Sequence, residues 1–191
     1  MPDGIRIESP LVRWRLEGAR KSRAGIVATE RPLLGHINLR ADAADARFAS
    51  TVERVLGVPL PTTPNTVATG REGVVYWLGP DEWLLVTSGE REGLVASTLR
   101  DALGDVFSSV TEIGSGQTLI VLHAPTVRDL LAKECPFDLT APSFAPGACA
   151  QTRLAKAAVL LRPLEGDAME LIVRRSFADY LWTWLADAAA E

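Results

Sequence analysis

The sequence is poor in the side chains on which most catalytic and metal sites depend. Its 191 residues include two histidines, His36 and His123, and two cysteines, Cys135 and Cys149. No Cys-x-x-Cys pair or run of His and Cys at ligand spacing occurs, which argues against a metal site and a disulfide framework. No segment reaches the roughly 20 apolar residues that a membrane helix needs. The start of the chain lacks the pattern of a secretory signal, so we expect a cytoplasmic protein that does not bind membranes.

The chain also lacks the basic surplus that binding to nucleic acid requires. Its formal net charge is -4 and its pI is near 5.3, which argues against nucleic acid as a partner. Residues 1–31 nevertheless carry seven Lys and Arg against four Asp and Glu. We therefore predict a basic N-terminal arm over 1–31, which is either a solvated terminus or a segment that docks on an acidic partner. Residues 32–191 have enough apolar residues for a single folded domain.

A β-hairpin over residues 76–86 is the clearest structural signal. Two runs rich in Val, Tyr, Trp and Leu flank Gly79-Pro80-Asp81-Glu82, in which proline presets the backbone for a turn. Two of the five tryptophans, Trp77 and Trp83, lie in this hairpin. Large aromatic side chains dominate core packing, so we expect the rest of the chain to pack against it.

Periodicity predicts the remaining elements. Asp42 is the expected N-cap of an amphipathic helix that ends at Gly57. Ser176, followed by Asp179, is the expected cap of a last helix whose inner face carries Phe177, Leu181, Trp184, Leu185 and Ala188. A further helix ends at Gly104, and Pro125 opens another. Strands are expected at 34–40, 66–69, 106–113, 117–123, 152–161 and 169–174, with a hairpin turn at 114–116.

The order of elements repeats along the chain. Leu84 and Leu171, Gly79 and Gly166, and Leu94 and Leu181 are all separated by the same distance in sequence. An internal duplication explains this spacing, although apolar strands also align with one another by chance. We predict an α+β fold of two similar halves, about 32–104 and 105–191, each an antiparallel sheet with helices packed on one side.

No catalytic template fits the sequence. Each histidine is alone on its predicted strand. Cys135 precedes Pro136 at a predicted helix end and Cys149 lies in an Ala-rich loop, so we expect neither thiol to be activated. The run that begins at Gly114-Ser115-Gly116 lacks the Gly-Lys-Ser/Thr ending of a phosphate-binding loop. Asp81 and Glu82 could act as paired acids, but adjacent acids at a turn are normally just solvated. We therefore predict no catalytic, cofactor-binding or metal-binding residue.

Aromatic and basic side chains near the two ends of the chain are the best candidates for contacts with a partner. Trp14 lies in the arm between Arg13 and Arg15, and Trp182 lies at the edge of the last helix's apolar face. Exposed aromatic residues and arginines are typical of protein interfaces. Burial of at least one of the two tryptophans in the core is an equally good interpretation.

Four stretches together resemble the gamma subunit family of heterotetrameric sarcosine oxidase. They are Ser9-Pro10-Leu11, Trp77-Leu78-Gly79-Pro80-Asp81-Glu82-Trp83-Leu84-Leu85, the strand pair entered by Thr111-Glu112-Ile113, and Val173-Arg174-Arg175-Ser176-Phe177 with the helix that follows. The resemblance covers nearly the whole chain. It implies a reduced relative of the folate-binding T-protein fold of the glycine-cleavage system, which is built from duplicated α+β halves.

The resemblance also implies a role in sarcosine catabolism. Alpha, beta and delta subunits would be the partners, and FAD, FMN, NAD and tetrahydrofolate would bind to those partner subunits. In such complexes sarcosine is oxidised to glycine, oxygen becomes hydrogen peroxide, and the one-carbon unit passes to tetrahydrofolate. The gamma subunit would be a cofactor-free packing subunit. The alternative is a stand-alone folate-binding or aminomethyltransferase-like protein, although the acidic residue that binds folate in T-proteins has no identified counterpart here.

Overall fold

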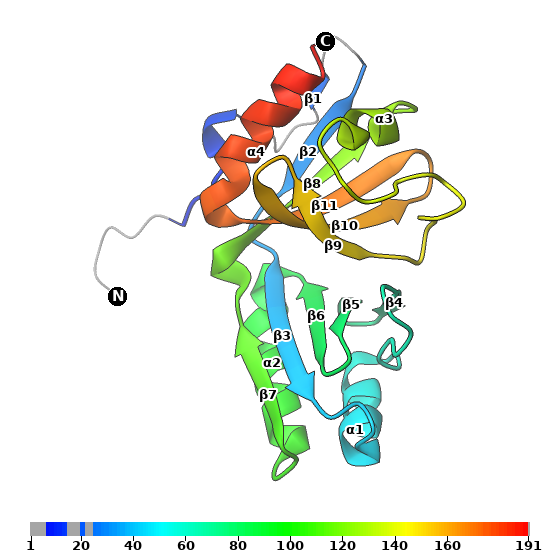
Figure 1. Cartoon of the computed structure of the whole chain (residues 1–191). Helices are drawn as coiled ribbons and strands as arrows, with labels where there is room; N and C mark the ends of the chain where they lie inside the picture. Colours follow the sequence, from blue (N-terminus) through cyan, green and yellow to red (C-terminus); the bar gives the residue numbers. More distant parts are fainter. Residues whose placement is uncertain (1–6, 15–19, 22–24, 191) are drawn as a thin grey trace.

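Two antiparallel β-sheets form the framework of the protein (Figure 1). The computed structural model describes residues 7–14, 20–21 and 25–190. The six-stranded sheet has the order β1 (Arg20–Lys21), β2 (Val27–Arg31), β8 (Gln117–His123), β11 (Ala168–Arg174), β10 (Ala157–Leu164) and β9 (Ala150–Leu154). The five-stranded sheet has the order β4 (Val67–Gly70), β5 (Gly73–Gly79), β6 (Glu82–Thr87), β3 (Gly35–Ala41) and β7 (Ser108–Glu112).

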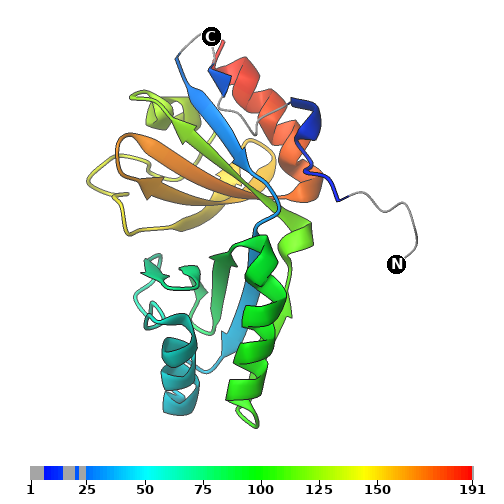
Figure 2. The same cartoon turned by 180° about the vertical axis from the view of Figure 1, so that it is seen from behind.

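Each sheet is covered by helices on one face. Helices α1 (Ala46–Leu56) and α2 (Glu92–Leu103) pack on the five-stranded sheet, whereas α3 (Val127–Ala132) and α4 (Arg175–Ala188) pack on the six-stranded sheet. Figure 2 shows α2 in front of its sheet, running along the strands. A third apolar cluster joins the two sheets through Tyr76, Leu84, Leu119, Leu160 and Ile172. The predicted α+β fold, with antiparallel sheets and helices on one side, is confirmed.

The two halves repeat one topology. If β3, β4, β5, β6 and β7 are matched with β8, β9, β10, β11 and β2, the strand order of the two sheets is the same. The repeated spacing found in the sequence follows this match, because Leu84 lies on β6 and Leu171 on β11. In the same way Leu94 lies on α2 and Leu181 on α4. The architecture therefore agrees with the predicted duplication.

The predicted boundaries differ from the structure in two places. Strand β7 follows α2 but pairs with β3, so the first half extends past residue 104 to the end of β7. Strand β2 lies inside the predicted arm of 1–31 yet pairs with β8 through the whole of its length. One of its inward residues, Glu30, is a buried carboxylate. Because a charged residue stands at an inward position, the sequence lacks the alternation of apolar and polar residues that indicates a strand. The folded body therefore includes the C-terminal end of the predicted arm.

The segment from Gly114 to Gly116 is not a hairpin turn. It forms the short 3-10 helix η3, which carries the chain from β7 in one sheet to β8 in the other. The predicted strand over 152–161 is likewise two strands, β9 and β10, joined by a turn at which Ala155 has a positive φ of 51°. The first error arose because a turn between two strands does not reveal whether they pair with each other. The second arose because no Gly or Pro marks the turn after Leu154.

Two predicted helix caps are replaced by other residues. The N-cap of α1 is Asp45, whose Oδ1 accepts hydrogen bonds from the backbone N–H groups of Arg47 at 2.8 Å and Phe48 at 3.3 Å. Asp42 instead accepts from the N–H of Ala44 in the preceding turn. Helix α1 ends, as predicted, at Gly57, whose φ of 75° suits a residue without a side chain.

The start of α4 and its buried face also differ from the prediction. The helix has Arg174 at its N-cap without a capping side chain, so Ser176 does not cap it. Trp182 is buried on its inner face, whereas Phe177 is 42% exposed. Leu181, Leu185 and Ala188 are buried as predicted, and Ala178 and Trp182 complete the buried face in place of Phe177 and Trp184.

The tryptophan hairpin has the predicted turn between β5 and β6. Trp83 is fully buried, its indole N–H donates to the carbonyl of Pro61 at 2.8 Å, and its ring lies 5.8 Å from that of Phe48 on α1. These contacts make the hairpin the anchor of the five-stranded half, as we expected.

Candidate functional site

Burial makes the imidazole of His36 a weak base and keeps the thiol of Cys149 protonated at neutral pH. Burial lowers the pKa of His36 to about 4, although the carbonyl of Leu34 acts in the opposite direction. Burial raises the pKa of the Cys149 thiol to about 11, so it is protonated and a poor nucleophile. Within the described part of the chain, no group of three or more His, Cys, Asp or Glu side chains could hold a metal ion.

Three of the four predicted interface residues meet in one cluster on α4. The indole N–H of Trp14 donates to Asp179 Oδ1 at 2.8 Å, and the guanidinium of Arg13 pairs with Asp179 Oδ2. The ring of Trp14 lies 6.3 Å from that of Trp182, which is 7% exposed. The hydrogen bond from Trp14, together with Arg13, lowers the pKa of the Asp179 carboxyl. Arg15 lies outside the described residues.

The segment before this cluster is anchored in the core. Leu11 is fully buried, and the carboxylate of Glu30 accepts hydrogen bonds from Ser9 Oγ and from Thr118 Oγ1, the latter at 2.6 Å. Ser9 Oγ also accepts from the N–H of Leu11 at 3.0 Å. The Ser9-Pro10-Leu11 stretch therefore holds the N-terminal segment on the folded body. Trp14 and Arg13 contact Asp179 of their own chain. That they also contact a partner stays a prediction.

A polar groove runs along the open face of β3 and β7. The helices cover the other face of these strands, and the cluster between the sheets covers only the side of β5 and β6. A hollow of about 650 Å³ follows this face up to the crossover, where Gln117 and Arg174 of the six-stranded sheet complete its wall. A second hollow, of about 610 Å³, continues along the same strands to Phe107 and shares Arg40 and Ser109 with the first.

The carboxylate of Glu82 organises the middle of this groove. Its Oε1 accepts from the side-chain amide of Asn38 at 2.8 Å, and its Oε2 accepts from the guanidinium of Arg40 at 2.6 Å. Both oxygens are therefore engaged, and Glu82 orients its neighbours instead of acting with Asp81 as an acid–base pair. At the upper end of the groove, the buried Oε1 of Gln117 has no hydrogen-bond partner. The groove offers charges of both signs and hydroxyl groups, which suit polar contacts with another protein.

The carboxylate of Glu92 binds both connections that carry the described chain from one sheet to the other. Glu92 Oε1, on α2, accepts from the backbone N–H of His36 at 3.0 Å and from that of Gly114 at 2.8 Å. His36 follows the β2–β3 connection, and Gly114 begins the β7–β8 connection. A Cβ on Gly114 would lie 2.6 Å from Glu92 Oε1, so a larger residue there would displace this carboxylate. Glu92 thus fixes the two halves relative to each other on the side of the groove.

A second polar contact joins the halves on the opposite side. The hydroxyl of Tyr76 on β5 donates to Glu170 on β11, and Arg162 on β10 lies 3.4 Å from the same carboxylate. Burial, followed by the negative charge of Glu170, raises the pKa of the Tyr76 phenol well above its usual value. Tyr76, Glu170 and Arg162 therefore link the two sheets, and Nη1 of Arg162 is buried there without a hydrogen-bond partner.

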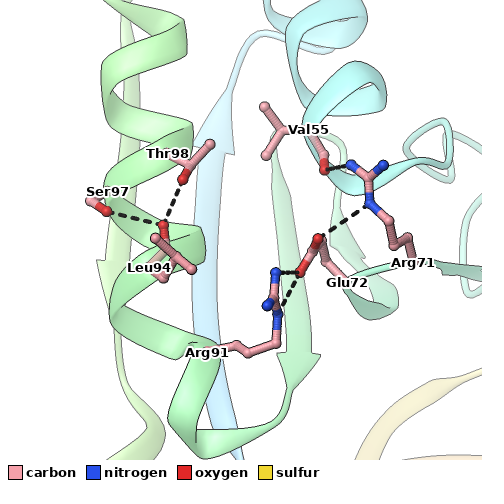
Figure 3. A network of polar contacts seen from close by, with 7 residues as sticks. All are labelled: Val55, Arg71, Glu72, Arg91, Leu94, Ser97 and Thr98. Carbon is pink, nitrogen blue, oxygen red and sulfur yellow. Dashed lines mark hydrogen bonds and ion pairs between the residues drawn. The ribbon is translucent and has the colours of Figure 1, made fainter.

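A third network closes the gap between α1 and α2 (Figure 3). Glu72 accepts two hydrogen bonds from Arg91, at 2.9 and 2.7 Å, and one from Arg71 at 3.3 Å. Arg71 also donates to the carbonyl of Val55 at the end of α1. These guanidinium groups are occupied by internal partners, so the network stabilises the helix layer.

Comparison with known proteins identifies the family. The family model of the sarcosine oxidase gamma subunit matches residues 40–191. The chain belongs to the sarcosine oxidase gamma subunit family. The gamma subunit of sarcosine oxidase from Corynebacterium sp. (strain P-1) is 33% identical over 175 residues, which are 91% of this chain and 85% of that protein. The gamma subunit from Corynebacterium sp. (strain U-96) is 34% identical over 71% of this chain and 65% of that protein.

Solved structures agree with this membership. A chain of the heterotetrameric sarcosine oxidase from Corynebacterium sp. U-96, in complex with pyrrole 2-carboxylate, superposes with a TM-score of 0.86 at 27% identity, over 96% of this chain and 95% of that one. Aminomethyltransferase T of the glycine cleavage system from Bartonella henselae gives a TM-score of 0.65 at 13% identity, over 94% of this chain and 57% of that one. The second match shows the fold alone and confirms the predicted likeness to T-proteins.

Three of the four stretches that suggested the family meet at the groove. Glu82 comes from the hairpin, Thr111 from the edge strand and Arg174 from the end of β11, and all three line the larger hollow. The sequence marked these stretches as characteristic, but it did not reveal that they lie together. The one signal available was the alternation of polar residues on β3 at Asn38 and Arg40, which indicated a solvated face.

Proposed function

We propose that this chain is the gamma subunit of a heterotetrameric sarcosine oxidase and that it supplies a packing surface, with no reactive group of its own. The family match over residues 40–191 carries this proposal. The groove along β3 and β7 supports it, because the groove is shallow and lined by charged and hydroxyl side chains, among which Asn38 and Arg40 donate hydrogen bonds to Glu82. Such a surface suits a polar protein interface better than the enclosed apolar pocket typical of small ligands.

In this proposal the larger subunits carry the chemistry. Alpha, beta and delta subunits are the partners, and FAD, FMN, NAD and tetrahydrofolate bind to them. They oxidise sarcosine to glycine, reduce oxygen to hydrogen peroxide and pass the one-carbon unit to tetrahydrofolate. The weak basicity of buried His36 and the protonated thiol of Cys149 support a structural role for this chain.

We also propose a cytoplasmic location. Both cysteines are free thiols, which suits a reducing compartment. Separately, none of the described helices has the length and apolar character required to cross a bilayer.

An affinity pull-down tests the proposed function. The tagged chain is isolated from its native organism at low salt, and the visible absorption spectrum of the eluate is recorded. We expect larger chains to co-purify and the eluate to show flavin bands. A colourless chain isolated alone would contradict the proposal, and calorimetric titration with tetrahydrofolate would then test the folate-binding alternative. Heat of binding and a raised melting temperature would favour that alternative.

A further inference from the structure

The two sheets differ at one edge. In the six-stranded sheet, β1 pairs antiparallel with the outer side of β2, through Arg20 with Ala28 and Lys21 with Val27. The topological equivalent of β2 in the five-stranded sheet is β7, which ends that sheet. Among the described residues, no strand lies on the outer side of β7 (Figure 1). The chain thus fills this edge in one half and leaves it open in the other.

The register of β7 shows which backbone groups face this open edge. The N–H of Ile113 donates to the carbonyl of His36 at 2.7 Å, so Ile113 and His36 form a hydrogen-bonded pair. Bonding alternates along an antiparallel pair, and therefore Thr111 and Ser109 also bond to β3. The residues between them, Val110 and Glu112, direct their N–H and carbonyl groups away from β3. Unpaired groups of this kind form a template for another strand.

Side chains around this edge mark it as a site of association. Phe107, directly before β7, is 97% exposed, the highest value among the large apolar residues of the described chain. It borders the smaller hollow of the groove. Arg100 of α2 covers the outward carbonyl of Val110 with two hydrogen bonds, at 3.1 and 3.0 Å, and pairs with Glu112. A charged side chain that covers an edge strand protects it from unwanted pairing.

We propose that one of the larger subunits adds an extended segment, antiparallel, to the outer edge of β7. The segment donates an N–H to the carbonyl of Val110 in place of Arg100, and it accepts from the N–H groups of Val110 and Glu112. An apolar side chain of the segment covers Phe107, and a basic side chain lies near Glu112. This inference rests on the proposed function, because the partner is a subunit of the same complex.

Two observations bear on the occupant of this edge, the first on its charge and the second on whether it is a second copy of this chain. The strand that fills the equivalent edge in the six-stranded half, β1, consists of Arg20 and Lys21, and is therefore basic in sequence. The chain as a whole carries a formal net charge of -4, which opposes association between copies. A basic segment of another subunit meets both conditions.

A proline substitution tests the inference without disturbing the pairing of β7 with β3. Val110→Pro removes an N–H that points outward, and proline is tolerated at such positions of edge strands. Val110→Ala is the matched control, because it loses the same packing against α2 but keeps the N–H. Each variant is mixed with the larger subunits purified without this chain, and the dissociation constant is measured by analytical ultracentrifugation. We expect at least a tenfold weaker complex for Val110→Pro and less than a threefold change for Val110→Ala.

Hydrogen exchange in the wild-type protein gives an independent result if the proline variant does not fold. We expect the amides of Val110 and Glu112 to exchange at least tenfold more slowly in the assembled complex than in the isolated chain. Equal binding by the two Val110 variants, or no added protection of these amides in the complex, would overturn the inference but leave the proposed function intact. A self-dimer lost in Val110→Pro would identify a second copy as the occupant and overturn the inference.

Failure of the wild-type chain to bind the larger subunits would refute the proposed function and this inference together.

Discussion

His36 should make the protein less stable as the pH falls from 7 to 5. Its side chain is fully buried on β3, and its Nδ1 lies 3.1 Å from the carbonyl oxygen of Leu34. Its Nε2 is buried without a hydrogen-bond partner. A second proton would therefore place an unpaired charge in the interior, which is why burial lowers the pKa from 6.5 to about 4.

The sign of the effect follows from the order of the two pKa values. In the unfolded chain His36 takes up a proton below about pH 6.5, while in the folded chain it stays neutral down to about pH 4. The unfolded state is therefore favoured as the pH falls through this window. The stability that the neutral imidazole contributes is complete above pH 6.5 and is lost toward pH 4. Between pH 7 and pH 5 these two values correspond to a loss of about 2 kcal/mol in the free energy of unfolding.

Urea unfolding at pH 7 and pH 5 measures this loss. His36→Asn keeps an amide that can donate to the carbonyl of Leu34 but does not titrate, so it should lose about 2 kcal/mol less than the wild type over this range. The matched control is His123→Gln, which removes the exposed imidazole of the other histidine. The carboxylates are the same in all three proteins, so their contribution to the pH dependence cancels when the variants are compared with the wild type.

A direct titration by NMR provides a second test. The ring protons of His36 should show no protonation step above pH 5 in the folded protein. A step near pH 6.5 for His36, or an identical pH dependence in His36→Asn and the wild type, would refute the argument that burial controls this group.

Two further substitutions test contacts that hold the fold together. Tyr76→Phe removes the hydrogen bond to the buried carboxylate of Glu170 and should lower the free energy of unfolding by about 1.5–3 kcal/mol, whereas the control Tyr180→Phe, at a residue that is 37% exposed, should change it by less than about 0.5 kcal/mol. Equal losses in the two variants would contradict the role of Tyr76 between the sheets. Leu11→Ala should cost about 2–5 kcal/mol, because Leu11 is fully buried, and Val12→Ala should cost far less, since Val12 is 46% exposed. Urea midpoints report both pairs, and a near-neutral Leu11→Ala would mean that the N-terminal segment does not contribute to the core.

Local elements were predictable because their signals are local. The β5–β6 hairpin follows from alternating apolar residues around a Gly-Pro turn, and the end of α1 follows from Gly57. The errors arose where a side chain had a distant partner. Asp179 was expected to support a cap of α4, but it accepts hydrogen bonds from Trp14 and Arg13 at the other end of the chain. Glu30 concealed β2, because its partners, Ser9 and Thr118, are themselves distant in sequence.

The candidate site was less predictable than the fold. Each of its residues lay in a recognisable stretch, yet Asn38, Glu82, Thr111 and Arg174 come from four strands that meet only in the folded chain. The periodicity of residues within one strand does not indicate which other strand will lie beside it.

The sequence by itself determined the family, the α+β class and the repeated order of elements, because these depend on motifs and on periods of 2 and 3.6 residues. Only the tertiary structure decided that β7 and β8 belong to different sheets and that β2 joins the second half. It also decided that no strand of the described residues pairs with the outer edge of β7. Strand pairing depends on hydrogen bonds between residues as far apart as Val27 and His123. Such partners are chosen when whole faces are buried together, a property of the assembled chain and not of any one segment.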